Sequence, residues 1–233
     1  MNAFTQSFKK YPRAWWFGIA ALVLTTCIVG LFQDWIYVID WPITYAIVSL
    51  RSTWITENIM VPISSTYWDV VLLFSAFIMC ALMRKKHLIW LLLVNLICIK
   101  ELSHVAKLIF NRARPYVQDP NIFLMQQYET SFPSGHSMVA VAFFGLVIYL
   151  IWAYNKDMSY QKQTKGWCIL IGALTVLVLI SRIYLAAHFA SDVIAGSCFS
   201  IIWLCFYTKW IVPLFIGKPD SPKKRRATSK KAA

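Results

Sequence analysis

The chain has 233 residues, of which 59% are hydrophobic and 16% aromatic, whereas soluble domains contain roughly 45–50% apolar residues. This excess excludes an ordinary soluble protein and predicts an integral membrane protein, because apolar runs near the ~20 residues that cross a bilayer recur along the chain. The formal net charge of +13 does not indicate nucleic-acid binding, because the basic residues gather between the apolar runs and in the tail, as topology determinants or anionic-lipid contacts do.

The pattern predicts an all-α polytopic membrane protein, with a six-span membrane domain at residues 1–216 and a basic, disordered tail at residues 217–233. The first span is expected to be retained, because no clear small-x-small cleavage site precedes the next polar stretch. Residues 33–68 mix polar and apolar side chains with two prolines, which indicates interfacial helices after the first span. The six expected transmembrane helices are residues 14–32, 69–83, 88–110, 137–154, 166–187 and 189–216.

The distribution of positive charge predicts the orientation of these spans. With six spans, both termini lie on one side of the membrane, and the termini and loops on that side hold 16 of the 23 lysines and arginines. The opposite loops hold only Arg51, Arg112 and Arg114. By the positive-inside rule, both termini are expected in the cytoplasm.

Two cationic residues lie near the end of the third expected span, Lys107 and Arg114, followed by Pro115. At about 100° per residue they are only about 20° out of line, so both side chains could converge on one anion if the helix continues that far. Pro115 would then mark the helix end or a kink. The alternative interpretation is a pair of snorkelling residues at a membrane boundary.

A second polar stretch, residues 131–137, immediately precedes the fourth expected span. Ser134 and Gly135 at a helix start leave backbone N–H groups unpaired, which together with the positive end of the helix dipole predicts a phosphate cradle. His136 adds a proton donor or acceptor beside this cradle. The alternative is a simple turn and helix N-cap.

The third stretch, between the fifth and sixth expected spans, contains Ser181, Arg182, His188 and Asp192. A spacing of four residues on a helix would place His188 and Asp192 on one face, where the carboxylate fixes the imidazole tautomer and leaves the other nitrogen free to attack an electrophile. Arg182 offers a planar fork of donors for phosphate oxygens. The alternative is a loop histidine that caps a helix, with Asp192 in its first turn.

The predicted topology places all three stretches on one face of the membrane. The third span ends there, the fourth begins there, and the fifth and sixth meet there. Three cations, a serine–glycine cradle and two histidines together indicate a site in which a histidine attacks a phosphate ester.

These residues resemble the three signature motifs of the type 2 phosphatidic acid phosphatase family of membrane lipid phosphatases. The resemblance covers residues 107–192, and every signature position is present. It implies that His188 is the nucleophile, that Asp192 orients it, and that His136 protonates the leaving oxygen. It further implies phosphate-binding roles for Lys107, Arg114, Ser134, Gly135, Ser181 and Arg182.

Four further ionisable residues lie near these motifs. Lys100, Glu101 and His104 lie deeper in the third expected span, where Glu101 is expected to pair with His104 or Lys100 in a structural network; a substrate or proton role is the alternative. Glu129 is expected at the mouth of the site.

The sequence therefore predicts a phosphatase that hydrolyses a lipid phosphate or diphosphate through a phosphohistidine on the extracytoplasmic face of a bacterial plasma membrane. This sidedness favours undecaprenyl diphosphate, and the resemblance also implies phosphatidylglycerophosphate and phosphatidic acid as alternative substrates. The partners are the lipid substrate and membrane lipids, with no nucleic acid. The resemblance implies that no cofactor or metal is needed, which agrees with the absence of a carboxylate cluster. The six cysteines lie in apolar runs without CxxC spacing and predict neither disulfides nor a metal site.

Two other functions are weighed against this one. A phosphotransferase would use the same site with a lipid acceptor in place of water. A transporter is the remote alternative, because no broken-helix repeat with matching halves accompanies the buried charges.

Overall fold

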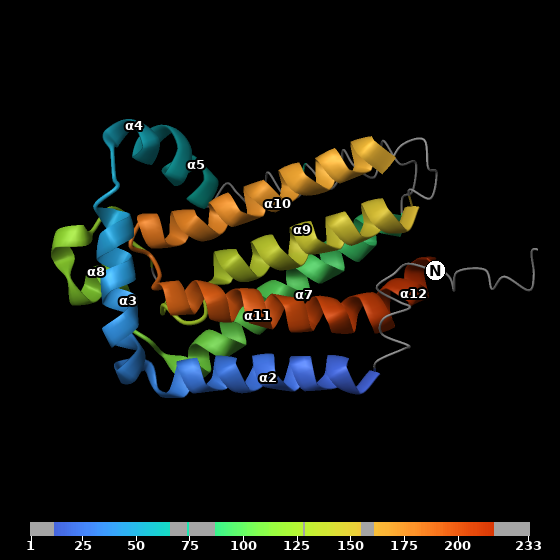
Figure 1. Ribbon diagram of the computed structural model, residues 1–233, viewed down its shortest axis with the longest axis horizontal. Coiled ribbons are helices and arrows are strands. Elements are labelled where there is room, and N and C mark those ends of the chain that lie inside the picture. The colour runs from blue at the N-terminus through green and yellow to red at the C-terminus, as the bar shows by residue number, and fades with distance from the viewer. Residues whose placement is uncertain (1–11, 66–73, 75–86, 128, 155–160, 217–233) are drawn as a thin grey trace, which may run out of the picture.

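The computed structural model describes residues 12–65, 74, 87–127, 129–154 and 161–216, and the regular elements within these ranges are all helical (Figure 1). The long helices of the bundle are α2 (Pro12–Leu31), α7 (His87–Phe110), α9 (Gly135–Tyr154), α10 (Gln161–Tyr184) and α11 (Ala190–Phe206), the last continued by η4 (Tyr207–Ile211) and α12 (Val212–Ile216). The elements at one end of the bundle are α3 (Gln33–Val48), α4 (Thr53–Ile55), η1 (Thr56–Met60), α5 (Val61–Ser64), α8 (Pro115–Gln118) and η2 (Pro120–Ile122).

Four described segments are long and apolar enough to cross a membrane, at Leu88–Gln118, Gly135–Ala153, Gln163–Tyr184 and Ala190–Phe215. They match the third to sixth expected spans and confirm the prediction of an all-helical membrane protein for this part of the chain. The fifth helix begins at Gln161, earlier than the expected residue 166, and ends at Tyr184. The expected second span, apart from residue 74, and the basic tail lie outside the described residues.

The first expected span corresponds to α2, which is followed by a sharp bend into α3. The segments Leu22–Leu31 and Asp34–Val48 meet at 94° and satisfy the length and hydropathy criteria for a span only as a pair. Helix α3 buries Asp40 and Thr44 against the protein, whereas Trp35 is 81% exposed and Val38 is 76% exposed. Its polar side therefore faces the end of the bundle, and its apolar side faces away.

Helix α9 packs against α7, α10 and α11 and occupies the centre of the bundle. The core between these helices is apolar, with a few polar contacts that join neighbouring helices. Asn95 on α7 donates to the Ala142 carbonyl at 3.1 Å and accepts from Trp203 Nε1 on α11 at 2.8 Å. Such interhelical hydrogen bonds satisfy polar groups that a bilayer would leave unpaired.

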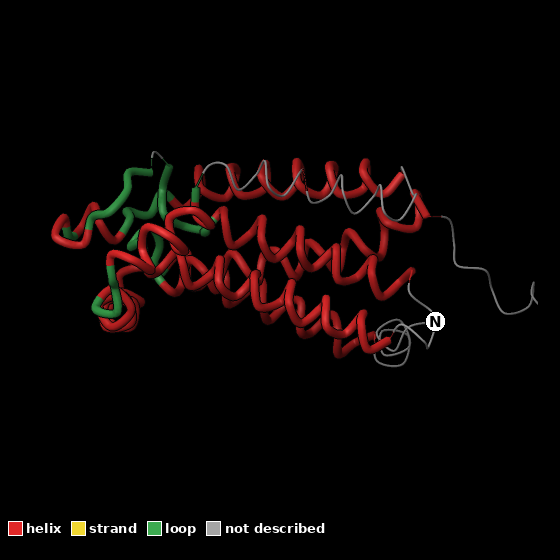
Figure 2. Tube along the Cα trace, turned by 90° about the horizontal axis from the view of Figure 1, so that it is seen from above, coloured by secondary structure: helices red, strands yellow, loops and turns green. Residues whose placement is uncertain are grey.

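The helix ends and loops that carry the three sequence motifs gather at the end of the bundle crossed by α3 and α8, as Figures 1 and 2 both show. The expected convergence of these stretches is therefore seen in the fold. Gly196 on α11 permits a close approach there, because a Cβ at this position would lie only 2.7 Å from the Ser134 carbonyl oxygen. The start of α9 thus rests directly on the α11 backbone.

Candidate active site

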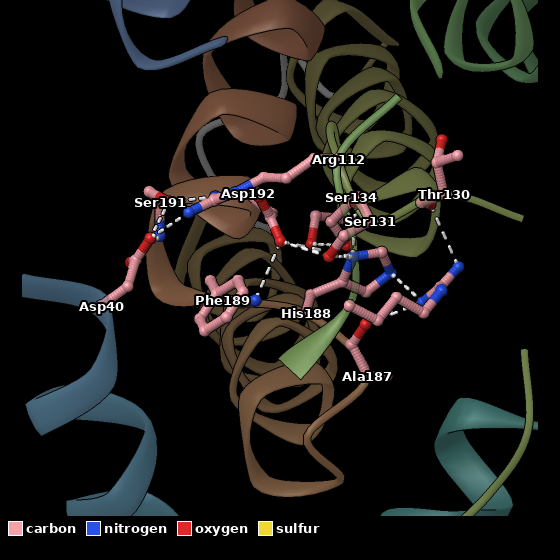
Figure 3. A network of polar contacts seen from close by, with 12 residues as sticks. Asp40, Arg112, Thr130, Ser131, Ser134, Ala187, His188, Phe189, Ser191 and Asp192 are labelled. Carbon is pink, nitrogen blue, oxygen red and sulfur yellow. Dashed lines mark hydrogen bonds and ion pairs between the residues drawn. The ribbon is translucent and has the colours of Figure 1, made fainter. Parts of the chain in front are cut away.

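His188 lies at the centre of the motif cluster, in the loop between α10 and α11, and is 1% exposed (Figure 3). Its Nδ1 is 2.7 Å from the Ser131 carbonyl oxygen, and its Nε2 is 3.2 Å from Arg114 Nη1. Because a carbonyl only accepts hydrogen bonds, this contact places the hydrogen on Nδ1, and the unprotonated Nε2 accepts from Arg114 Nη1, a donor that a bound phosphate would draw to itself. Burial, together with the positive charges of Arg114, Arg182 and Lys107, lowers the pKa of His188 well below its usual value. The imidazole is therefore held neutral.

Asp192 contacts His188 less directly than the four-residue spacing predicts. Helix α11 begins at Ala190, so the two residues do not share a helix, and Asp192 Oδ2 is 3.8 Å from His188 Nδ1. That oxygen instead accepts hydrogen bonds from Ser131 Oγ at 2.6 Å and from the Phe189 N–H at 2.9 Å. Asp192 thus sits in the first turn of α11, as the alternative interpretation had it, and reaches His188 mainly through Ser131.

Arg182 is completely buried in the last turn of α10. Its Nη1 donates to the Ser64 carbonyl at 3.3 Å, while its Nε and Nη2 have no hydrogen-bond partner among the described residues. An unpaired buried donor costs about 1–3 kcal/mol, and more for a charged group, so an anion at these nitrogens would be strongly favoured. The neighbouring Ser181 is held by Ser64, whose hydroxyl lies 2.8 Å from that of Ser181.

Lys107 and Arg114 both reach the cluster, but not along one helix. Helix α7 ends at Phe110, and Arg114 precedes α8, which Pro115 opens. The helix does not continue to Arg114, so the alignment over two helical turns that depended on it does not occur, and the irregular stretch between the helices turns Arg114 inward. Its Nη1 donates to the Ala187 carbonyl at 2.7 Å, beside His188.

The predicted cradle lies at the start of α9. The helix begins at Gly135, so the N–H groups of its first turn point away from the helix and toward a potential anion. The Ser134 N–H does not belong to this set, because it donates to the Asp192 carbonyl at 3.1 Å. A Cβ at Gly135 would lie 3.6 Å from Lys107 Nζ, so the cradle borders this lysine. His136 follows in the same turn and is half-buried.

Glu129 is at the edge of the cluster, as expected, and its carboxylate is bonded to Lys107 Nζ. Its side chain is 57% exposed, and the bond to Lys107 lowers the pKa of the carboxyl group. His104 Nδ1 lies 3.9 Å from the same carboxylate. Lys107 thus already holds an anionic group at the site.

Sequence reasoning missed four residues that support the cluster: Asp40, Ser64, Arg112 and Ser131. Asp40 and Arg112 are charged residues in apolar surroundings, a signal that could have drawn attention to them. Ser64 and Ser131 carry no such signal, because their contacts join segments far apart in the chain. Arg112 is paired with both Asp40 and Asp192, at 2.8 and 2.5 Å (Figure 3).

Comparisons with known proteins show the family and the proteins to which the chain is similar. A family model described as the PAP2 superfamily matches residues 85–215. The chain is 39% identical over 84 residues to phosphatidylglycerophosphatase B of Bacillus subtilis (strain 168), a match that covers 36% of this chain and 39% of that relative. It is also similar to the crystal structure of a transmembrane PAP2-type phosphatidylglycerolphosphate phosphatase from Bacillus subtilis, with a TM-score of 0.71 and 26% identity over 82% of this chain and 94% of that one.

Proposed function

Because the chain belongs to the PAP2 superfamily, we propose that it is a membrane phosphatase that hydrolyses a lipid phosphate or diphosphate through a phosphohistidine at His188. The observation that carries this proposal is the presence, in one cluster, of a neutral, buried imidazole and a buried Arg182 whose Nε and Nη2 have no partner among the described residues. The first can attack phosphorus, and the second can bind the phosphoryl oxygens.

In the first step, His188 Nε2 attacks phosphorus and the bond from phosphorus to the lipid oxygen breaks. His136 donates its proton to that oxygen, and the lipid leaves as an alcohol or, from a diphosphate, as a monophosphate. In the second step, water attacks the phosphohistidine, His136 takes a proton from the water, and inorganic phosphate is released. The second step restores His188 and His136 to their starting forms, so the proton lost by His136 in the first step is recovered from water.

The cations and the start of α9 stabilise the charge that develops on the equatorial oxygens. Lys107, Arg114 and Arg182 supply positive charge, and the N–H groups from Gly135 onward supply hydrogen bonds. Incoming phosphate would displace the Glu129 carboxylate from Lys107. This exchange of one anion for another keeps the lysine paired throughout.

Two candidate substrates have separate support. The names of the Bacillus subtilis relatives favour phosphatidylglycerophosphate. The charge distribution, which predicts an extracytoplasmic site, favours undecaprenyl diphosphate in a bacterial plasma membrane. In either case the exposed apolar side of α3 would lie in the membrane interface, where Trp35 acts as an anchor.

Purified protein in mixed micelles tests the proposal directly. We expect release of inorganic phosphate from one of the two lipids without any acceptor, and an acid-labile phosphoprotein after brief incubation with labelled lipid. The variant His188→Ala should give neither. Transfer of the labelled phosphoryl group to an added acceptor lipid, without release of inorganic phosphate, would instead establish a phosphotransferase, and turnover by His188→Ala would exclude the mechanism.

A further inference from the structure

Asp40 is a buried carboxylate on α3, the helix that crosses the end of the bundle (Figures 1 and 3). Its side chain is 2% exposed, and both of its oxygens contact residues of the candidate site. Oδ1 accepts from the Ser191 N–H at 3.0 Å, and Oδ2 accepts from Ser191 Oγ at 2.5 Å and from Arg112 Nη2 at 2.8 Å. Asp40 therefore ties α3 to the first turn of α11.

Arg112 joins Asp40 to Asp192. Its Nη1 donates to Asp192 Oδ1 at 2.5 Å and to Ser191 Oγ at 2.7 Å. The guanidinium carbon also lies 4.6 Å from the ring centres of both Tyr37 and Phe189. Planar hydrogen bonding and ring stacking together fix the orientation of the guanidinium, which a lysine ammonium in its place would not reproduce.

The contacts continue from Asp192 to the proposed nucleophile. Asp192 Oδ2 accepts from Ser131 Oγ at 2.6 Å, and the Ser131 carbonyl oxygen is 2.7 Å from His188 Nδ1. The continuous path therefore runs from Asp40 through Arg112, Asp192 and Ser131 to His188. Each link is a short polar contact between buried groups (Figure 3).

On this basis we propose that Asp40 and Arg112 are positioning residues for the reaction at His188. They hold Asp192, which holds Ser131, whose carbonyl sets the tautomer and direction of the imidazole. The inference rests on the proposed function, because it concerns the same site. It adds that α3, which lies outside the segment that resembles the signature motifs, helps to position the residues of that site.

Charge gives Asp40 a second role in the same path. Attack by Nε2 while Nδ1 keeps its hydrogen makes the phosphorylated imidazole of His188 cationic. Arg112 alone would neutralise Asp192, but with Asp40 the three groups carry a net charge of −1. Asp40 therefore preserves the negative charge that stabilises this cation, which low-dielectric surroundings make more important.

Two variants and one control test this role. Asp40→Asn keeps the shape but removes the charge, and Arg112→Lys keeps the charge but removes the planar fork. Asp34→Asn removes an exposed carboxylate from the same helix as the control. Each purified protein is assayed for kcat and KM with the active lipid and for competitive inhibition by inorganic phosphate, with thermal unfolding followed in parallel.

We expect kcat to fall on the order of 100-fold in both variants, because small errors in the position of a reacting group have effects of this size. KM and the inhibition constant for phosphate should change by less than about threefold, because Lys107 and Arg182 are untouched. The control should match the wild type. This split between kcat and phosphate binding is not expected from a general loss of structure.

The proposal would be overturned by normal kcat in Asp40→Asn and Arg112→Lys. It would also be overturned if kcat and phosphate affinity fell together, or if neither variant folded, because the two residues would then serve stability alone. The wild-type rate tests the proposed function, and the ratio of variant to wild type tests this inference. A wild type that releases no phosphate from any lipid would refute the proposed function and this inference with it, whereas an active wild type with equally active variants would refute this inference alone.

Discussion

The contact between Gly196 and the start of α9 provides a sharp test of how the site is held. Replacement by alanine in Gly196→Ala would place a Cβ 2.7 Å from the Ser134 carbonyl oxygen and 3.3 Å from Met138 Cγ. The first neighbour is backbone, so it cannot move aside as a flexible side chain would. The two helices must separate, or α9 must shift along α11.

The size of this shift follows from ordinary contact distances. A carbon atom and a carbonyl oxygen usually approach to about 3.3 Å, and the difference from 2.7 Å is about 0.6 Å. Because Ser134 is the first residue of the predicted phosphate cradle and its N–H donates to the Asp192 carbonyl, the shift would displace both the cradle and this contact. A misplacement approaching 1 Å costs on the order of 10²-fold in rate, so we expect kcat to fall roughly ten- to hundredfold. Overpacking should also destabilise the protein by about 1–3 kcal/mol.

Gly172→Ala is the matched control, because Gly172 lies within α10 and a Cβ there would meet nothing within 4 Å. Phosphate release by the two purified variants is compared with the wild type at saturating lipid, together with thermal unfolding in the same detergent. The control should be as active and at least as stable as the wild type, since alanine favours helix over glycine. Full activity of Gly196→Ala would refute the argument that this approach sets the position of the cradle.

Four further predictions concern the chemistry and topology of the site. His188→Ala should abolish phosphate release, and Asp192→Asn should leave an enzyme slower by about 10²- to 10⁴-fold; near-normal turnover of His188→Ala would remove it as nucleophile. Activity should survive EDTA and be inhibited by vanadate, which imitates five-coordinate phosphorus; loss in EDTA with recovery in magnesium would indicate a different mechanism. Because the pKa of His188 is lowered, kcat/KM should decline on the acid side with an apparent pKa below the free-imidazole value of about 6.5, once titration of the lipid phosphate is corrected for. Activity is lost as the pH falls through the lowered pKa, because the imidazole then becomes protonated. An apparent pKa above the free-imidazole value would contradict a neutral resting imidazole. Single cysteines placed at Gln118 and at Gln161 in a cysteine-free background should react oppositely with a membrane-impermeant thiol reagent in intact cells or spheroplasts: the cysteine at Gln118 should be labelled and the one at Gln161 should not. The reverse pattern would place His188 in the cytoplasm and exclude undecaprenyl diphosphate released on the outer face as the substrate.

Much of the candidate site could be predicted because its residues are expensive in apolar surroundings. Arg182, His188 and Asp192 are ionisable residues within or beside apolar segments, which identifies them as candidates, and their order along the chain matches a family pattern. The local geometry was less predictable. The third span was predicted to end at residue 110, as α7 does, but the spacing of Lys107 and Arg114 left open whether the helix continued to Arg114. The chain instead reaches the site by an irregular stretch, whose path depends on packing against neighbouring segments that periodicity does not encode.

Hydropathy and charge are properties of short segments, so the sequence by itself determined the helical class, the third to sixth membrane spans and the chemical groups of the site. Tertiary structure alone decided which polar groups meet. It placed the Ser131 carbonyl, not the Asp192 carboxylate, on His188 Nδ1, and it joined Asp40 to Arg112 across 72 positions of the chain. A buried polar group takes whichever partner the packed helices bring within hydrogen-bond distance, and in a bundle that partner often comes from a distant part of the chain.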